Sequence, residues 1–265
     1  MKINIKIGIT MKKLAILLCF ILLVPLVAKG QGSVMDENYF FNHFIGLTGG
    51  IGLISYNGSL SLFNEQVDCD SYNFYAKNEF QTNVLFGLRA EWRFSKRFDL
   101  YASLLYENRS AKFEPNNYTT SEELGQPELV IVSHLQELNA KINIFSITPM
   151  IKYRPFDFDF GILVGPSFAF MVSDELDSKE SIIEPDWVYY NEIGERERTI
   201  YSGEIENKYS ILTDLKFGIT YGLMITERIK LSPEIFYVLP LMKVKPEVDW
   251  KISSLQFLVS LSYGF

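Results

Sequence analysis

The last twelve residues of the chain alternate between large apolar and small or polar side chains. Apolar residues occupy every second position from Leu255 to Phe265, and serine, glutamine or glycine fills most positions between them, with Leu258 as the exception. Side chains on a β-strand point alternately to opposite faces, so this segment has one apolar and one polar face. Period-two alternation of this length predicts a strand and excludes an amphipathic helix.

Seven further segments repeat the pattern. Each holds 11 to 17 residues, enough for a tilted strand of about 9–11 residues that crosses a bilayer. The predicted strands cover residues 44–55, 82–94, 98–109, 144–154, 158–172, 209–225 and 229–239. The fourth is the least regular, because Pro149 falls on its apolar face. With the C-terminal segment, the sequence therefore predicts eight strands.

The connections between these strands alternate between long and short. Long connections cover residues 56–81, 110–143, 173–208 and 240–249, and short ones cover residues 95–97, 155–157 and 226–228. Long external loops and short periplasmic turns are typical of outer-membrane barrels. The spacing predicts an up-and-down order in which neighbouring strands are antiparallel.

The aromatic residues favour a membrane barrel over a secreted sandwich, whereas the charges alone permit either. The apolar faces carry no charge, whereas thirteen charged residues fall on the other faces. Aromatic residues gather at the ends of the apolar faces, as in interfacial girdles; they are Trp92, Phe94, Phe98, Tyr153, Phe158, Phe170, Tyr209, Tyr237 and Tyr263. We therefore predict an all-β, eight-stranded antiparallel up-and-down transmembrane β-barrel over residues 44–265. A bilayer offers no hydrogen-bond partners, so the first and last strands must pair and close the ring.

The N-terminal region reads as an export signal. An apolar run from Leu14 to Ala28 follows Lys12 and Lys13 and precedes a small-x-small pattern at 28–30. Its 15 residues are too few for a transmembrane helix of about 20 residues, so residues 1–30 are predicted as a cleaved signal peptide, with 1–10 as an upstream extension. Residues 31–43 would form a periplasmic N-terminal segment.

Cleavage of this signal would make the chain markedly acidic. Residues 1–30 hold five lysines and no acid, so their removal leaves 20 basic and 32 acidic residues. A formal charge of −12 argues against nucleic acid as a partner. Cys69 would be the one cysteine left, which excludes an intramolecular disulfide.

One pair of segments resembles a known family. Residues 147–156 read Ile-Thr-Pro-Met-Ile-Lys-Tyr-Arg-Pro-Phe, and residues 161–170 read Gly-Ile-Leu-Val-Gly-Pro-Ser-Phe-Ala-Phe. Together they resemble the core of the PorT-like outer-membrane β-barrel domain of Bacteroidetes-type bacteria. The resemblance implies a barrel over roughly residues 44–265 and, for a few members, a part in protein secretion or surface assembly. It brings no catalytic residue, and the acidic third loop is longer than such proteins usually need.

The polar faces carry nearly balanced charge. Eight strands enclose a space that side chains just fill, and unpaired buried charge is costly, so we predict a structural ion-pair network in the lumen; the alternative is a narrow polar conduit or proton path. The predicted network comprises Arg89, Glu91, Arg93, Glu107, Arg109, Lys152, Asp214, Lys216 and Glu234, and the other inward charges are Asp99, Arg154, Asp159 and Lys230.

The third long loop is the most acidic part of the chain. Between Asp174 and Glu206 it holds eleven acids and three bases. We interpret it as a solvated hairpin above the membrane whose Trp187, Tyr189 and Tyr190 form a candidate contact patch. The carboxylates would suit Ca²⁺, but their spacing matches no EF-hand loop, so divalent binding stays an alternative and no metal or cofactor site is predicted.

Enzyme signatures are sparse. Only His43 and His134 could serve as bases at neutral pH, and neither lies in a nucleophile, phosphate-loop or zinc motif. The favoured hypothesis is a non-enzymatic membrane anchor whose loops bind a surface or secretion partner. A small transporter or channel is the first alternative, and an outer-membrane lipid-modifying enzyme or protease is the second. Tyr263 and Phe265 are expected to lie in outer-membrane lipid at the periplasmic rim, as a signal recognised by barrel-assembly machinery.

Overall fold

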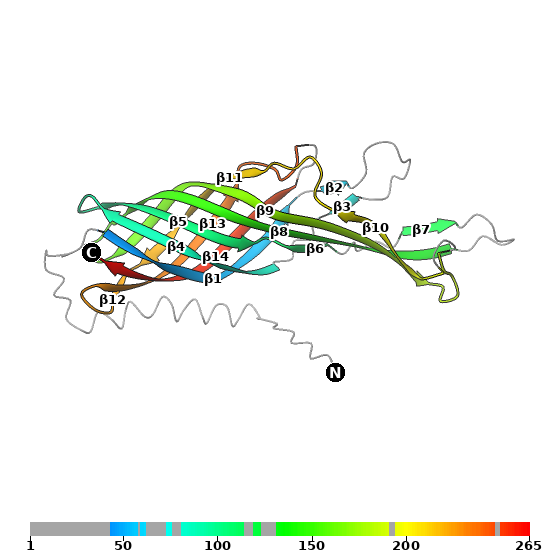
Figure 1. Ribbon diagram of the computed structural model, residues 1–265, viewed down its shortest axis with the longest axis horizontal. Helices are drawn as coiled ribbons and strands as arrows, with labels where there is room; N and C mark the ends of the chain where they lie inside the picture. The colour runs from blue at the N-terminus through cyan, green and yellow to red at the C-terminus, as the bar shows by residue number, and fades with distance from the viewer. Residues whose placement is uncertain are drawn as a thin grey trace. The chain divides into compact units, whose positions relative to one another are not determined.

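The computed structural model describes residues 43–57, 59–61, 73–75, 81–113, 119–122, 131–190, 194–246 and 250–265. The predicted signal peptide, nearly all of the segment 31–43, and Cys69 lie outside these residues. Eight strands form a closed ring in which each is antiparallel to its neighbours (Figure 1). In ring order they are β1 (His43–Asn57), β4 (Gln81–Arg93), β5 (Phe98–Asn108), β8 (Ile131–Tyr153), β9 (Phe160–Glu184), β11 (Ile211–Tyr221), β13 (Ile229–Pro240) and β14 (Lys251–Gly264).

This ring confirms the predicted eight-stranded up-and-down barrel. The first and last strands pair without a break, from Phe44 opposite Gly264 to Asn57 opposite Lys251. The Phe265 N–H also donates to the His43 carbonyl at 3.1 Å. Among the described residues, no helix is long and apolar enough to cross a membrane.

The barrel turns its apolar side chains outward and its charged side chains inward. Leu47 on β1, for example, is 66% exposed, whereas all thirteen inward charges are buried. The outward apolar residues of β14 run from Leu255 to Phe265, about 33 Å along the strand. At the tilt usual for such barrels this gives an apolar band of about 25 Å. Only lipid can cover such a surface favourably.

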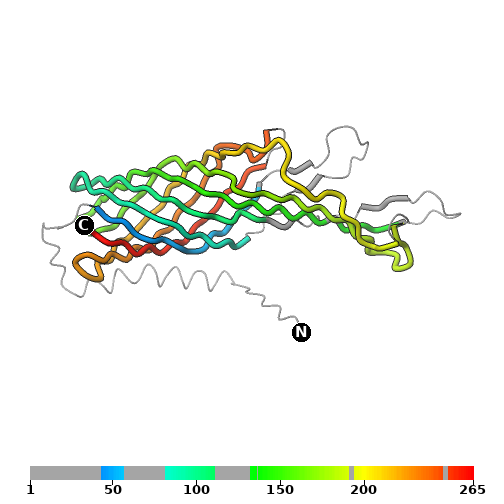
Figure 2. The backbone as a smooth tube through the Cα atoms, viewed as in Figure 1, coloured from blue at the N-terminus to red at the C-terminus, as the bar shows by residue number. Residues whose placement is uncertain are grey.

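The fourth and fifth predicted strands prove much longer than expected. β8 begins at Ile131 rather than 144, and β9 runs to Glu184 rather than 172. They stay paired beyond the barrel and appear as the long arm of Figure 2. The two predicted strands are too short because the outward residues become polar at Asn143 and Ser173. In β9, Val172 is also an extra residue that reverses the alternation of inward and outward side chains.

Short strands extend this arm into a sheet. β10 (Glu197–Gly203) pairs with β9, and β6 (Ala111–Phe113) and β7 (Thr119–Glu122) pair with β8. A separate hairpin forms from β2 (Ser59–Ser61) and β3 (Asn73–Tyr75). The predicted loops 56–81, 110–143 and 173–208 thus contain strands that sequence alternation alone did not reveal.

The sixth predicted strand, 209–225, is shorter than expected. β11 covers residues 211–221, and β12 (Leu223–Met224) continues it beside β13. Gly222 lies between β11 and β12, and its N–H donates to the Asp159 carbonyl at 2.7 Å. A β-carbon at Gly222 would lie 2.2 Å from the Asp159 carboxylate, so only glycine fits there.

Candidate functional site: the lumen and the sheet beyond the barrel

A buried charge cluster fills the half of the lumen nearest the short turns. Lys152 on β8 lies at its centre, with Nζ 2.6 Å from Asp159, 3.1 Å from Glu91 and 3.6 Å from Asp99. Lys230 on β13 approaches Glu91 at 2.7 Å from the opposite wall. Bases and acids thus alternate in space, which offsets part of the cost of removing them from water.

Three arginines complete this cluster. Arg89 binds Glu91 at 2.6 Å and also contacts Glu234. Arg93 and Arg154 bind the remaining carboxylates, Asp159 at 2.7 Å and Asp99 at 3.0 Å respectively. Lys152 and Arg154 belong to the segment that carries the family resemblance, so its Lys-x-Arg spacing places two bases in the lumen.

The carboxylates of Glu91, Asp99 and Asp159 come close enough to suggest a cation site. One oxygen of each lies within 4.8 Å of the others. Lys152 contacts all three, so its ammonium already supplies the positive charge that the group requires. The arrangement is an ion-pair cluster with a tethered cation.

A second, smaller charge cluster lies nearer the long loops. Arg109 binds Asp214 and Glu107, each at 3.2 Å. Glu107 also accepts hydrogen bonds from Ser146 at 2.8 Å and from Gln256 at 3.2 Å. The Tyr56 hydroxyl donates a hydrogen bond to the Arg109 carbonyl.

Lys216 is the exception in the predicted network. Its Nζ lies 4.6 Å from the centre of the Phe236 ring, which gives a cation–π contact. Among the described residues, no ion pair joins Lys216 to an acid within 4 Å. The structure thus groups eight of the nine predicted residues in ion pairs and adds Asp99, Arg154, Asp159 and Lys230 to the same clusters.

Apolar side chains separate the two charge clusters. Along β5 the inward order is Asp99, Tyr101, Ser103, Leu105 and Glu107, so two large apolar residues lie between acids of different clusters. The other strands complete the layer with Leu85, Met150, Leu163, Phe236 and Leu258.

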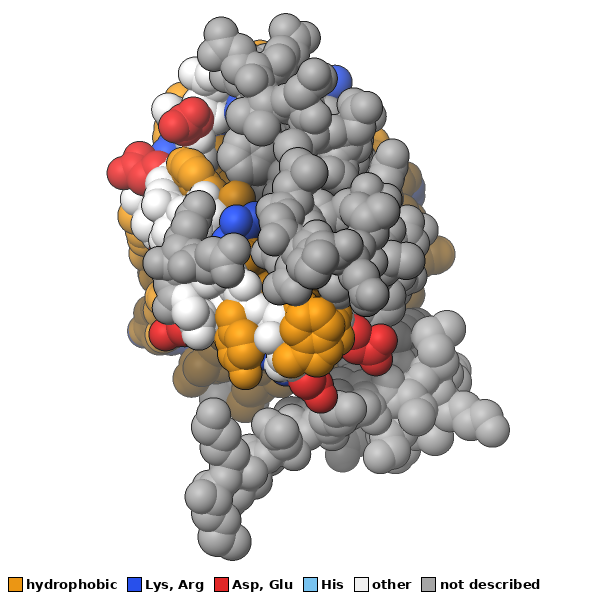
Figure 3. All heavy atoms as spheres, turned by 90° about the vertical axis from the view of Figure 1, so that its right-hand side faces the viewer, with side chains coloured by type: hydrophobic (Ala, Val, Ile, Leu, Met, Phe, Trp, Pro, Cys, Tyr) orange, Lys and Arg blue, Asp and Glu red, His pale blue; other side chains and the backbone are white. Residues whose placement is uncertain are grey.

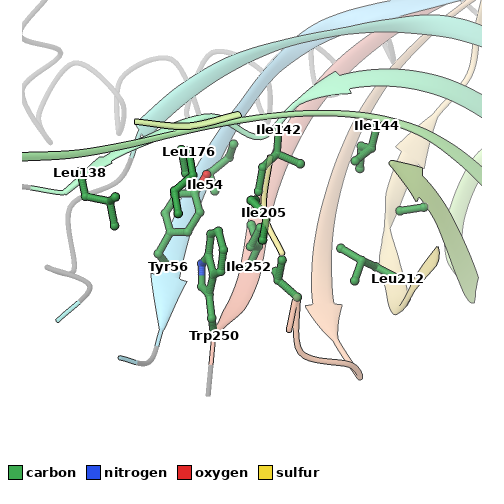
Figure 4. Close-up of a cluster of buried hydrophobic side chains, with 13 residues drawn as sticks. Ile54, Tyr56, Leu138, Ile142, Ile144, Leu176, Ile205, Leu212, Trp250 and Ile252 are labelled. Carbon is green, nitrogen blue, oxygen red and sulfur yellow. The ribbon is translucent and has the colours of Figure 1, made fainter. Parts of the chain in front are cut away.

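A second apolar cluster closes the lumen on the loop side. Trp250, Tyr56 and Leu176 point toward one another from different elements there, with Ile205 beside them (Figure 4). Trp250 and Tyr56 are each 2% exposed. The lumen therefore consists of alternating charged and apolar layers of buried side chains.

The sheet beyond the barrel has a small core of its own. Val132, Ile182, Val188 and Tyr190 form a buried cluster. His134 lies beside this cluster, and its Nδ1 is 3.2 Å from the Tyr190 hydroxyl and 3.5 Å from a Glu180 oxygen. This core holds the tip of the β9–β10 hairpin in place.

The predicted contact patch divides into exposed and buried residues. Trp187 and Tyr189 are 58% and 49% exposed, but Tyr190 is only 7% exposed. Arg198 lies over the Tyr190 ring at 4.4 Å and closes it off from solvent. The inclusion of Tyr190 in the patch was therefore wrong, because its ring packs in the small core with Val132, Ile182 and Val188.

Many acids of the third loop have basic partners. Six of the eleven form ion pairs, namely Asp174, Glu175, Glu180, Asp186, Glu197 and Glu204; Glu192 lies outside the described residues. The hydrogen bond from Lys179 to Glu197, 2.8 Å long, raises the pKa of that lysine. Viewed end-on, acidic and apolar side chains both reach the described surface (Figure 3).

The C-terminal residues lie at the barrel rim formed by the short turns. Tyr263 and Phe265 are both exposed on the outer face, and Arg228 donates to the Tyr263 hydroxyl at 2.8 Å. The His43 ring stacks on Phe265 and on Trp92, with ring centres 5.8 and 6.0 Å apart. The His43 ring is therefore held by stacking against aromatic rings at the rim.

Comparisons with known proteins place this barrel among outer-membrane proteins. The family model described as "outer membrane protein beta-barrel domain" matches residues 33–245. A comparison with curated proteins gave no match.

Several solved structures are similar in fold. The attachment invasion locus protein Ail of Yersinia pestis is 9% identical, with 84% of this chain and 99% of that one covered and a TM-score of 0.35. Neisserial surface protein A is 9% identical over 84% and 97%, with a TM-score of 0.34. OprG of Pseudomonas aeruginosa is 10% identical over 85% and 96%, with a TM-score of 0.35.

Proposed function

Because the chain belongs to the outer membrane protein β-barrel domain family, whose place is the bacterial outer membrane, we propose that it is a non-enzymatic membrane anchor. In this proposal the barrel holds the extracellular sheet of β8, β9 and β10 above the membrane, and the sheet binds a protein partner. The observation that carries the proposal is the length of β8 and β9 beyond the apolar band.

The dimensions of this arm support a binding role. From Ser173 to Glu184, β9 continues for eleven residues past the point where its outward face becomes polar, about 36 Å along the strand. β10 pairs with it, and the small core around Val188 orders the tip. A hairpin without a binding role has little reason to be so long and so well packed.

The exposed residues of the tip indicate the chemistry of the partner. Trp187 and Tyr189 are the residue types that most often carry binding energy in protein interfaces. Acids such as Glu184 and Asp186 flank them. We infer a partner with an apolar pocket bordered by basic side chains.

The packing of the lumen supports an anchor over a channel. The charged residues there are buried, all but Lys216 form ion pairs with one another, and an apolar layer lies between the two clusters. Planar-bilayer recordings are expected to show no open-pore conductance, and a steady single-channel conductance would favour the transporter instead.

The contacts of the two histidines support a non-enzymatic role. His43 stacks on two aromatic rings, and His134 lies against Tyr190 and Glu180 inside the small core. Substitution of both histidines should leave the lipid composition of the outer membrane unchanged. A change in acylation would favour the enzyme hypothesis.

We further propose that the chain is PorT-like, since Lys152 and Arg154 of the resembling segment hold the lumen cluster. This would connect the partner to protein secretion or surface assembly. Barrel-assembly machinery would be a separate, transient partner that reads Tyr263 and Phe265 during insertion.

The test compares two double variants by cross-linking and affinity isolation from native membranes. Trp187→Ala/Tyr189→Ala is expected to reduce a co-isolated partner at least tenfold. Lys179→Gln/Glu197→Gln, which removes an exposed ion pair on the same sheet away from the tip, should retain it. Both variants should keep heat-modifiable migration on gels, which reports an intact barrel. Equal recovery of the partner with both variants would contradict the proposal.

A further inference from the structure

The outer wall of the barrel carries an apolar groove. It has a volume of about 480 Å³ and opens toward the membrane across β1, β4 and β5 to β8. Its lining is almost entirely apolar, with the residues Leu47, Thr48, Phe86, Gly87, Leu88, Leu104, Tyr106 and Phe145. Because the groove lies in the membrane-facing wall, lipid acyl chains contact it.

The shape of the groove follows from the strand register. Phe86, Tyr106 and Phe145 are directly opposite one another on three neighbouring strands, with ring centres 5.1 and 5.4 Å apart. On β1 the position opposite Phe86 is Gly49, which has no side chain. The aromatic row therefore stops abruptly and leaves a recess beside it.

A row of polar side chains lies directly above the aromatic row. Asn108 donates to Asn143 at 2.8 Å, and Asn143 donates to Ser173 at 2.9 Å. Asn108 and Asn143 are two residues further along the strands than Tyr106 and Phe145, which is about 7 Å. The wall thus changes from apolar to hydrogen-bonding within one side-chain repeat.

This polar row borders a second hollow on the loop side. The hollow has a volume of about 380 Å³ and is lined by Lys141, Asn143, Ser173, Asp174, Glu175, Gly203 and Glu204. Lys141 is the one base in this lining, and it is engaged with Glu175 at 2.8 Å. Three acids, the amide of Asn143 and the hydroxyl of Ser173 therefore make up most of the polar lining, and Lys208 pairs with two of the acids, Asp174 and Glu204. The acids outnumber the bases at the hollow, which disfavours an anionic phosphate and suits uncharged hydroxyl groups.

We propose that these two hollows form one binding site for a glycolipid of the outer leaflet. Its acyl chain lies in the groove against Tyr106 and Phe145. Its sugar hydroxyls bind the amide row at Asn143 and the polar hollow above. The site is independent of the protein partner proposed above, because it lies on the barrel wall rather than on the tip of the hairpin.

The experiment uses the full-length protein in nanodiscs that contain photoreactive lipid. One probe is a glycosyl diacylglycerol with a diazirine in its acyl chain, and the other is phosphatidylglycerol with the same chain. Cross-linked peptides are quantified by mass spectrometry. The glycolipid should label residues 86–88, 104–106 and 145 at least fivefold more than the wall formed by β11 and β13, whereas phosphatidylglycerol should label both walls equally.

Two matched variants locate the site. Tyr106→Ala/Phe145→Ala removes two groove residues, and Phe217→Ala/Tyr237→Ala removes the corresponding aromatic pair, with ring centres 5.5 Å apart, from the other wall. The first should abolish the enrichment and the second should preserve it. Heat-modifiable migration identifies any variant that fails to fold.

A third variant tests recognition of the head group if the groove variant does not fold. Asn143→Leu should reduce glycolipid enrichment severalfold and leave phosphatidylglycerol labelling unchanged. The proposal is overturned if the glycolipid labels all walls equally, if phosphatidylglycerol shows the same enrichment, or if enrichment survives both the groove and the Asn143 variants.

Discussion

Replacement of Lys152 by methionine should destabilise the barrel more than any other single lysine substitution in the described strands. Its ammonium lies within 3.6 Å of three buried carboxylates, those of Glu91, Asp99 and Asp159. Methionine has a similar volume and no charge, so the variant keeps the packing and removes the central cation. The three carboxylates would then face one another in a site with almost no solvent access.

The magnitude follows from burial. Loss of one partner of a buried ion pair costs about 3–5 kcal/mol, because the remaining charge stays desolvated. Lys230 and Arg93 still approach Glu91 and Asp159, which places the expected loss near the lower limit, about 3 kcal/mol. This corresponds to about a hundredfold change in the unfolding equilibrium.

Lys141→Met is the matched control. Its ion pair with Glu175 has a length of 2.8 Å, close to that of Lys152 with Asp159, but both side chains are at least half exposed. Solvent screens such pairs, and the control should leave stability unchanged. The shortest ion-pair distance is nearly the same in the two cases, so the difference between the variants measures the combined effect of burial and of the two additional carboxylates around Lys152.

The assay is urea unfolding of each variant in lipid vesicles, followed by the gel shift between folded and unfolded forms. A double variant that adds Glu91→Gln should recover part of the loss, because it removes one of the carboxylates left without its cation. If Lys152→Met unfolds at the same urea concentration as the wild type, the lumen cluster contributes no net stabilisation and the reasoning fails.

Three further predictions concern other parts of the chain. Deletion of Phe265 should slow membrane insertion in an assembly assay and leave the urea midpoint of the inserted barrel within error, whereas equal damage to both would contradict its role as an assembly signal. Gly50→Ala should lower the urea midpoint strongly, because a β-carbon there would lie 1.9 Å from a carbonyl oxygen of the next strand; the neighbouring Gly49→Ala, with its closest atom at 3.5 Å, should not. Lys179 should titrate above the usual lysine pKa in an NMR titration and return to it in Glu197→Gln; because the folded pKa is raised, its contribution is present at neutral pH and lost as pH rises through that value.

The barrel could be predicted from the sequence because both faces of a membrane strand are constrained. Its outward residues must be apolar to meet lipid, and its inward residues must be small or polar to share a narrow lumen. Leu255 to Phe265 satisfies both conditions at every position but Leu258, which the structure buries in the apolar layer between the charge clusters. Exceptions to the alternation thus mark layers of the lumen.

The sheet formed by β8, β9 and β10 beyond the barrel could not be predicted in the same way. Beyond Asn143 and Ser173 both faces of β8 and β9 contain polar residues, so apolar alternation fades although the ladder continues. The partners of individual charges also escaped prediction. Lys152 meets Glu91 because the ring places β8 and β4 on either side of β5, so that both side chains enter the same part of the lumen. Sequence spacing alone does not give this relation.

The bulge at Val172 allows β9 to continue from the lipid-covered barrel into water. Below it, the buried residues of β9 are odd-numbered, as Leu163 and Ala169 are, and above it they are even-numbered, as Leu176 and Ile182 are. The same sequence in a regular strand, with no bulge, would send Leu176 outward and the charge of Glu175 inward. At the edge of the lipid, the bulge therefore changes which alternate residues of β9 point inward. The hairpin above it can place apolar residues over the lumen and charged residues toward water, while its backbone remains hydrogen-bonded to the barrel below.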